Sequence, residues 1–324
     1  MTQATNQAND QPTGKLVSVY MPTRNRVRLL GRAVESVLCQ SHADIELIVV
    51  DDASSDDTSR YLAEKAASDP RLVPLRNAAP CGAPASRNLA IRRARGDFVT
   101  GLDDDDEFLP ERIGGFVDYW RLLESRGVRP ACLYAQDVWV ENGVRRAPTR
   151  KPGLVSADIL LQDNHIGNQV FAPWTHFVEA GLFDEALPAW QDLDLFIRML
   201  RRFGEAHLLD MPSYLFDVTP RPDRISAQEK KLRAAFKMLA AKHAANNPLQ
   251  KKALFLQLFQ EGYGISPKAA DWLSILRWGG FPKGVLRLLR ASRVRRGASA
   301  ARVSAKAPPV RPLPMASESV HGCD

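Results

Sequence analysis

The chain has 324 residues, of which 45% are apolar and 25% charged, a composition typical of a globular protein with one large or two small domains. No run of about eighteen apolar residues occurs, so we expect no membrane-spanning helix. The net charge of +7 resides in one segment, Asp271 to Asp324, which has ten Arg or Lys against three Asp or Glu. The rest of the chain is balanced, and this argues against nucleic acid as a partner.

The two ends of the chain are polar or biased in composition. We expect residues 1–14 to form a disordered leader without a secretory signal, and residues 297–324, rich in Ala, Ser, Pro and Arg, to form a disordered tail. The cysteines lack a CxxC pair and a histidine at zinc-ligand spacing. We therefore expect no structural zinc or disulfide scaffold, a cytoplasmic location, and buried apolar roles for Cys39, Cys81 and Cys132.

The first hundred residues alternate between strand-like and helix-like patterns. Buried apolar runs predict four strands, and helical spacing or capping residues predict three helices between them. In chain order these are a strand at Leu16–Met21, a helix at Arg26–Gln40, a strand at Ile45–Val50, a helix from Asp56 or Asp57 to about Ala67, a strand at Arg71–Arg76, a helix at Ala83–Ala94 and a strand at Phe98–Leu102. This rhythm predicts an α/β fold with a mainly parallel central sheet and helices on both faces.

Beyond residue 125 the pattern is less regular. Ala131–Val140 and the residues after the Asn142-Gly143 turn predict a hairpin. Leu193–Phe203 has the spacing of an amphipathic helix, and two more helices are expected between Ser226 and Tyr263. Near the end, Pro282–Arg290 predicts a helix with basic side chains on one face and apolar ones on the other. We therefore expect a helical extension after the sheet domain.

Three polar segments follow predicted strands, at the edge where a parallel sheet binds its ligands. They are Pro22–Arg26, Asp51–Ser55 and Asp103–Glu107. In an extended chain alternate side chains share a face, so we expect Asp103 and Asp105 to point into one site. Such carboxylates suit Mg²⁺ or Mn²⁺, which takes one or two of them together with substrate phosphates.

Other interpretations of the acidic segments are possible. A solvated acidic turn is common for four consecutive aspartates, but their position after a buried strand favours a metal. An EF-hand is excluded, because its sixth and twelfth positions would be Phe108 and Gly114. No GxGxxG motif follows the first strand, so a dinucleotide cofactor is unsupported. For Asp52 a hydrogen bond from a base or ribose remains open.

These segments resemble the family-two glycosyltransferases, whose fold is called GT-A. The matching stretches are VSVYMPTRNR, RAVESVLCQ, IELIVVDDASSDDT, CGAPASRNLAIRRARGDF and LDDDDEFLP, followed by GLFDEALPAWQDLDLFIRML at Gly181–Leu200. Each piece alone is weak, but their order and spacing are those of the family. The resemblance implies a GT-A domain at 15–225, with a nucleotide-binding half at 15–110 and an acceptor half at 111–225, and a helical extension at 226–296.

The resemblance also implies a role for each matching residue. Asp192 corresponds to the aspartate that the family uses as general base. Asp103 and Asp105 correspond to the first and third positions of the acidic motif, with Asp105 the better ligand for Mn²⁺ or Mg²⁺ and Asp103 nearer the ribose. The other residues implied in binding a nucleotide-sugar donor are Pro22, Thr23, Arg24, Asn25, Asp52, Arg87 and Asp104.

The block around the implied base departs from the family at one position. The family usually has Glu before the base, and this chain has Gln191, which we expect to alter how the acceptor is held. Asp192 could instead be a helix N-cap, a role compatible with catalysis because a helix N-terminus keeps a carboxylate ionised. Trp190 is expected either to stack on an acceptor sugar or to fill the core, and His165 and His176 are expected to be structural.

The resemblance implies an inverting transferase that moves a sugar from a nucleotide diphosphate, with uridine preferred, to an acceptor hydroxyl. A single base suits inversion, because one attack opposite the leaving group needs no covalent intermediate. The alternative is a catalytically silent nucleotide-sugar-binding partner of a glycan-assembly complex. We expect a surface or lipid-linked glycan as acceptor, because residues 272–296 have the pattern of a helix on an anionic membrane surface. The competing interpretation is that this helix packs on the domain.

Overall fold

The structure is a computed structural model that describes residues 15–219, 228–260, 263–278 and 283–300. The expected leader lies outside these residues, as does the expected tail from residue 301 on. The last helix continues through Ala300, so the boundary expected at residue 297 falls inside it. Among the described residues, no helix is long and apolar enough to cross a bilayer.

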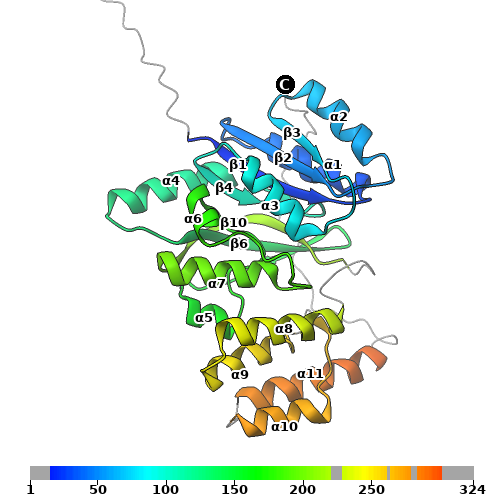
Figure 1. The fold of residues 1–324 in the computed structure, drawn as a ribbon, viewed down its shortest axis with the longest axis vertical. Helices are drawn as coiled ribbons and strands as arrows, with labels where there is room; N and C mark the ends of the chain where they lie inside the picture. Colours follow the sequence, from blue (N-terminus) through cyan, green and yellow to red (C-terminus); the bar gives the residue numbers. More distant parts are fainter. Residues whose placement is uncertain (1–14, 220–227, 261–262, 279–282, 301–324) are drawn as a thin grey trace, which may run out of the picture.

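The central sheet has the strand order β3-β2-β1-β4-β9 (Figure 1). The four strands of the first hundred residues run parallel, and β9 is antiparallel to β4. Their bounds are β1 Val17–Thr23, β2 Ile45–Asp51, β3 Leu72–Arg76, β4 Phe98–Gly101 and β9 Ala172–Pro173. The predicted α/β fold with a mainly parallel sheet is confirmed.

Helices cover both faces of this sheet. They are α1 Val27–Leu38, α2 Thr58–Ser68, α3 Ala83–Arg93, α4 Arg112–Ser125, α6 Trp174–Glu179 and α7 Gln191–Phe203. The short helix α5 Ala157–Gln162 packs against α7 instead. Side chains alternate along a strand, so Val17, Val19 and Met21 of β1 share one core with α1 and α4. Tyr20, on the other face, belongs to the core formed with α3 and α7. Both faces of β1 are therefore buried, which explains why its residues are mostly apolar.

A second sheet has the order β5-β10-β6-β7, with β8 paired to β10. Its strands are β5 Glu107–Phe108, β6 Cys132–Glu141, β7 Val144–Pro148, β8 Leu154–Val155 and β10 Ala206–Asp217. The predicted hairpin is present as β6 and β7, and Asn142 and Gly143 both have the positive φ of a type I′ turn. The sequence pattern does not predict β10, because register shifts around Pro212 break the alternation by which a strand is recognised.

The helical extension follows the sheets and stacks on α5 and α7 (Figure 1). In the described part of the chain it consists of α8 Glu229–His243, α9 Pro248–Gln257, α10 Ala269–Arg277 and α11 Lys283–Ala300. Helices α8 and α9 confirm the two helices expected between Ser226 and Tyr263, whereas α10 has no counterpart among the predicted elements.

The basic helix near the end, α11, packs on the rest of the extension. Leu288 is fully buried, and a Cβ on Gly284 would touch Leu256 of α9 at 3.4 Å. Leu286 and Leu289 stay 47% and 43% exposed. The observed position of α11 thus matches the interpretation that it packs on the domain, and membrane contact by its exposed side remains a prediction.

The expectation for the cysteines was wrong at two of three positions. Cys132 is fully buried in β6, whereas Cys39, at the end of α1, and Cys81, in the loop before α3, are exposed. Both exposed cysteines lie outside regular elements, where no apolar periodicity directs a side chain inward.

A buried ion cluster joins α7 to the helical extension. The carboxylate of Asp194 is fully buried and lies 2.7 Å from Arg198 Nη2, 2.7 Å from His243 Nε2 and 3.0 Å from Lys242 Nζ. Burial alone would raise the pKa of Asp194, but the contacts with His243, Arg198 and Lys242 outweigh it and hold the pKa well below its usual range. The cluster therefore fixes α8 against the helix that carries Asp192.

We expect Asp194→Asn to lower the free energy of unfolding by about 3 kcal/mol, the low end for breaking a buried ion pair, because Lys242 is partly exposed and can turn to solvent. The depressed pKa means that this stabilisation is present above the unfolded-state pKa of about 4 and is lost as the pH falls through the lower folded-state pKa. Urea unfolding at several pH values measures both effects. Asp184→Asn removes a half-buried partner of the same lysine and should cost less than about 1 kcal/mol. Equal losses in the two variants would contradict this role of Asp194.

Candidate active site

A cavity of about 1420 Å³ opens at the carboxyl ends of β1, β2 and β4. Of the residues implied in donor, metal or base roles, all except Asn25 line it: Pro22, Thr23, Arg24, Asp52, Arg87, Asp103, Asp104, Asp105 and Asp192. The rest of the wall comes from the second sheet and the helical extension, through residues such as Trp139, Phe216, Leu232, Phe259 and Leu286. The fold therefore gathers the predicted residues at the predicted edge of the sheet.

Asn25 does not line the cavity but shapes the turn between β1 and α1. Its φ is 53°, in the left-handed region that Asn tolerates better than most residues. Its Oδ1 accepts a hydrogen bond from Ser55 N at 2.7 Å, and its own N–H donates to Ser54 Oγ at 2.9 Å. Asn25 thus ties the turn after β1 to the turn after β2, and the direct donor contact expected for it stays a prediction.

Asp52 organises the loop that leads into α3. Its carboxylate accepts hydrogen bonds from Cys81 N (2.8 Å), Gly82 N (2.9 Å) and Asn77 Nδ2 (2.7 Å). Burial would raise the pKa of Asp52, but these hydrogen bonds outweigh it and the pKa lies below its usual value. Asp52 is therefore ionised and rigidly held where it meets the cavity.

The four consecutive aspartates form a turn, in which Asp106 N donates to Asp103 O at 3.1 Å. The extended geometry from which we expected Asp103 and Asp105 to share a face is therefore wrong, although both line the cavity. Asp103 accepts from Arg87 Nη2 and Asn168 Nδ2, each at 2.9 Å. Arg26 Nη1 lies 3.4 Å from Asp105 Oδ2.

The other two aspartates of the turn hold it in place. Asp104 accepts from Thr23 Oγ1 at 2.7 Å and from Arg26 Nη1 at 2.9 Å. Burial raises the pKa of Asp104 to about 6, opposed by Arg26 and reinforced by Asp105. Asp106 accepts from Tyr214 OH at 2.7 Å, and burial, with Asp105 nearby, raises its pKa well above the usual range. The turn is thus anchored to both sheets, which leaves Asp103 and Asp105 as its cavity-facing carboxylates with part-exposed side chains.

Asp103 and Asp105 fit a divalent ion that is shared with a substrate. In the described part of the chain, no group of three or more His, Cys, Asp or Glu is placed to hold a metal by itself. An ion bound through phosphates takes only one or two protein carboxylates. The side chains of Asp103 and Asp105 are 25% and 12% exposed, and both line the cavity. This donor set matches an ion carried by a diphosphate.

Arg87 on α3 provides a positive charge next to this pair. Besides its ion pair with Asp103, it lies over the ring of Phe183, 5.4 Å from the centroid. Its Nε is buried without a hydrogen-bond partner in the described part of the chain. An unsatisfied buried guanidinium N–H is costly, so this donor is suited to an anionic ligand.

Asp192 lies in the first turn of α7 and is not its N-cap. Trp190 occupies the N-cap position, with φ 58° and ψ 29°, and makes no capping hydrogen bond. A left-handed tryptophan is strained and needs support, which comes from Trp190 Nε1 donating to Tyr263 OH at 3.0 Å. The neighbouring Gln191 is buried and donates from Nε2 to Leu187 O at 3.0 Å. The N-cap alternative for Asp192 is therefore wrong.

The electrostatic surroundings of Asp192 are those of a general base. Burial raises its pKa to about 6, while the Leu193 N–H and Arg87 oppose the rise and the charge of Asp103 adds to it. No side-chain hydrogen bond or ion pair holds the carboxylate of Asp192 in the described structure, whereas Asp103, Asp104 and Asp105 are all paired with arginine. A carboxylate that is unpaired, partly buried and titrates near neutrality is suited to take a proton.

Sequence reasoning missed several residues of the cavity wall. Arg26 ends the segment Pro22–Arg26, which we did expect at the ligand-binding edge of the sheet. Tyr263 and Arg287 come from the helical extension, and no local sequence pattern predicts that they reach the cavity. His165, which we interpreted as structural, lines the cavity. His176 is structural as expected, because its ring stacks on Phe203 with the centroids 3.9 Å apart.

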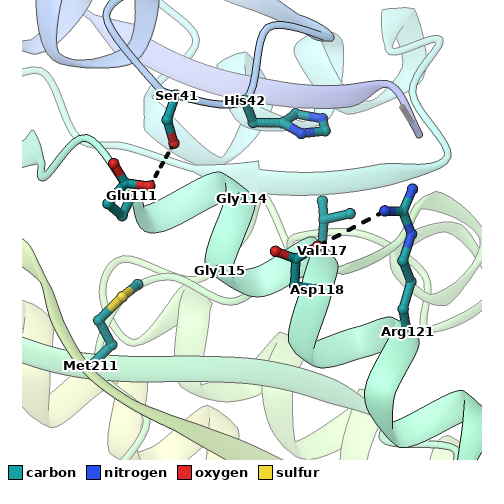
Figure 2. A pocket seen from close by; sticks show the side chains of 9 residues that line it. All are labelled: Ser41, His42, Glu111, Gly114, Gly115, Val117, Asp118, Arg121 and Met211. Carbon is teal, nitrogen blue, oxygen red and sulfur yellow. Dashed lines mark hydrogen bonds and ion pairs between the residues drawn. The ribbon is translucent and has the colours of Figure 1, made fainter. Parts of the chain in front are cut away.

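A second, smaller cavity of about 350 Å³ lies beside α4 (Figure 2). Four of its polar side chains pair with each other: Ser41 Oγ donates to Glu111 Oε2 at 2.8 Å, and Arg121 Nη1 lies 3.8 Å from Asp118 Oδ1 (Figure 2). The ring of His42 lies 3.1 Å from the Lys15 carbonyl oxygen. None of the residues implied in donor, metal or base roles lines it. The chemistry of the molecule therefore centres on the larger cavity.

The chain has a mainly parallel sheet with a second sheet beside it, and its acidic turn shares a cavity with Asp192. This is the arrangement of the GT-A glycosyltransferases. The chain belongs to glycosyl transferase family 2, whose model matches residues 18–180. A similar protein is WcaA of Escherichia coli K12, which is named a colanic acid biosynthesis glycosyl transferase. It is 34% identical over 265 residues, which are 81% of this chain and 92% of WcaA.

Solved structures show the same fold. Staphylococcus aureus TarS, residues 1–349 in complex with UDP-GlcNAc, has a TM-score of 0.58 and 17% identity, covering 88% of this chain and 92% of TarS. The mannosyltransferase PcManGT of Pyrobaculum calidifontis, in complex with GDP-Man and Mn²⁺, has a TM-score of 0.52 and 17% identity, covering 90% and 77%. The GT-A fold and the family expected from the sequence are confirmed.

Proposed function

We propose that the protein is an inverting transferase that moves a hexosyl group from a UDP-sugar to an acceptor hydroxyl in the synthesis of a bacterial surface or lipid-linked glycan. One observation carries the proposal: the unpaired Asp192, with a pKa near 6, lines the same cavity as Asp103, Asp105 and Arg87. Transfer of a sugar from a nucleotide diphosphate requires a general base for the acceptor hydroxyl and a set of residues that binds the phosphates, and the cavity contains both.

The residues divide the reaction between them. Asp192 accepts the proton of the acceptor hydroxyl at a carboxylate oxygen as that hydroxyl attacks the sugar carbon. Arg87 binds and orients the departing diphosphate through its buried guanidinium. When bound, Mn²⁺ or Mg²⁺ would be held by Asp105 and Asp103 with the donor phosphates and supplies Lewis-acid stabilisation of the leaving group. One unpaired carboxylate suits a single displacement, which inverts the anomeric centre.

The first experiment is a screen of nucleotide-sugars for Mn²⁺-dependent hydrolysis. The family resemblance implies uridine as the nucleobase of the donor, and TarS was solved with UDP-GlcNAc. Because PcManGT was solved with GDP-Man, GDP-mannose belongs in the screen as well. Hydrolysis of a UDP-sugar supports the proposal, and hydrolysis of GDP-mannose alone would change the proposed nucleobase from uracil to guanine. No hydrolysis of any donor, together with intact UDP binding, would instead point to a catalytically silent partner.

We also propose that the protein is cytoplasmic and that α10 and α11 rest on an anionic membrane surface. Leu273 and Leu276 of α10 are 68% and 62% exposed, and Leu286 and Leu289 of α11 are nearly half exposed. Exposed leucines next to a basic helix such as α11 are typical of peripheral membrane contact. This arrangement would bring a lipid-linked acceptor to the cavity, whose wall includes Leu286.

We expect full-length protein to sediment with phosphatidylglycerol vesicles and to be released at high salt, since basic residues near such a surface contribute about 1 kcal/mol each. Leu273→Ser with Leu276→Ser should weaken this binding by roughly tenfold or more, because each buried leucine contributes about 1.5–3 kcal/mol. Leu122→Ser on α4, 42% exposed, is the matched control and should sediment like the wild type. Equal sedimentation of the double variant and wild type would show that these leucines do not contact the membrane.

A further inference from the structure

Away from the acidic turn, which Arg26 pairs with, four more basic side chains without a donor role line the cavity: Arg150, Lys151, Arg287 and Arg290. Lys151 Nζ lies 2.7 Å from Asp137 Oδ2, and Arg287 Nη2 lies 3.4 Å from Asp163 Oδ2. Arg150 and Arg290 are exposed, and in the described part of the chain neither has a carboxylate within 4 Å. This portion of the wall therefore keeps two uncompensated positive charges.

A chain of contacts connects this basic wall to the base. Trp190, two residues before Asp192, donates from Nε1 to Tyr263 OH at 3.0 Å. Tyr263 N–H donates to Gln260 O at 3.1 Å, the Gln260 side chain donates to Asp163, and Asp163 pairs with Arg287. Arg290 follows one turn later on α11. Since the base must contact the acceptor, the wall that continues from Trp190 to α11 is suited to the acceptor.

We propose that the acceptor carries an oxyanion, phosphate or carboxylate, and that Arg150 and Arg290 bind it. The guanidinium group is a planar fork of N–H donors that matches either oxyanion with two parallel hydrogen bonds. Helix α11 then completes the acceptor half of the site, which the family model, ending at residue 180, does not include. The proposal rests on the proposed function, because it assigns the acceptor of that same reaction.

Two sources of the oxyanion fit the wall. Leu286 and Ala291 lie beside Arg290 in the lining, so the diphosphate of a lipid-linked glycan is one source. An acidic sugar in a growing glycan is the other. The probes that represent them are farnesyl diphosphate for the lipid, glucose 1-phosphate and methyl glucuronide for the sugars, and methyl glucoside as the uncharged control.

The test is calorimetry on the full-length protein, with and without saturating UDP and Mg²⁺, which fill the donor side and displace any probe bound there. At least one charged probe should bind in the presence of UDP, and methyl glucoside should not. Arg150→Gln and Arg290→Gln should each weaken that binding about tenfold, since each removes a charge-assisted hydrogen bond. Arg277→Gln, at an exposed arginine of α10 outside the cavity lining, is the matched control and should bind like the wild type.

Each outcome decides something. Binding of farnesyl diphosphate alone supports the lipid source, and binding of glucose 1-phosphate or methyl glucuronide supports the sugar source. Displacement of every charged probe by UDP, equal binding of methyl glucoside, or equal weakening by Arg277→Gln would overturn the proposal. If UDP itself does not bind, the proposed UDP-sugar donor fails instead. The titrations without UDP then still show whether the charged probes depend on Arg150 and Arg290.

Discussion

Asp192→Asn is expected to lower turnover by roughly 10²–10⁴, the usual contribution of general base catalysis, while UDP affinity stays within about twofold. Asparagine keeps the shape of the side chain but cannot accept a proton at neutral pH. Asp192 makes no ion pair in the described structure, so its replacement removes no structural contact comparable to those of Asp194. The measurements are donor hydrolysis, with water as acceptor, and UDP binding by calorimetry.

The pH dependence provides an independent readout of the same residue. The base works in its ionised form, and burial raises the pKa of Asp192 to about 6. In the wild type kcat/KM should therefore fall as the pH drops below about 6, by up to tenfold per unit, and should level off above about 7. The residual activity of Asp192→Asn should lack this inflection.

Asp184→Asn is the matched control, because Asp184 lies in the loop before α7 and does not line the cavity. It should keep both the wild-type rate and the inflection. If Asp192→Asn loses UDP binding as severely as turnover, Asp192 serves the structure of the site. If the inflection persists in Asp192→Asn, it belongs to another group, and Asp104, whose pKa is also raised to about 6, is the first to replace.

The central sheet was predictable because its strands are buried on both faces. Such strands appear in the sequence as mainly apolar runs, as in Leu47–Val50, and the helices between them follow their own period. β10 escaped prediction because its pairing with β6 shifts register around Pro212. A bulged strand is defined by its partners, here β5, β6 and β8, and these lie far away in the sequence.

The donor side of the cavity was predictable for a related reason. Its residues follow strands directly, so Thr23, Asp52 and Asp103 reach the carboxyl edge without any long-range packing. The chemistry of the acidic segment was less predictable, because a turn and an extended strand place Asp103 and Asp105 differently although the residues are the same. Arg150 and Arg290 could not be placed in the cavity, since Arg150 follows β7 of the second sheet and Arg290 depends on how the helical extension docks.

Asp105→Ala is expected to abolish most of the metal-dependent part of UDP affinity. Asp105 lines the cavity, its side chain is 12% exposed, and Arg26 Nη1 lies 3.4 Å from its Oδ2. A carboxylate of this cavity wall can serve as a direct ligand of an ion that is shared with the diphosphate. Loss of a direct ligand should weaken metal-dependent binding by roughly 10² or more, above the 10–100-fold typical of groups that only orient a ligand.

The measurement is UDP binding by calorimetry with Mn²⁺ and with a chelator, because the difference between the two isolates the metal term. In the wild type Mn²⁺ should strengthen UDP binding markedly, and in Asp105→Ala the two values should nearly coincide. Glu107→Gln, at a nearby carboxylate that pairs with Arg32 outside the cavity lining, should behave like the wild type. Thermal unfolding checks that Asp105→Ala is folded, which is expected because Asp104 and Asp106 anchor the turn. An unchanged Mn²⁺ effect in a folded Asp105→Ala protein would remove Asp105 from the metal site and leave Asp103 as the residue to test.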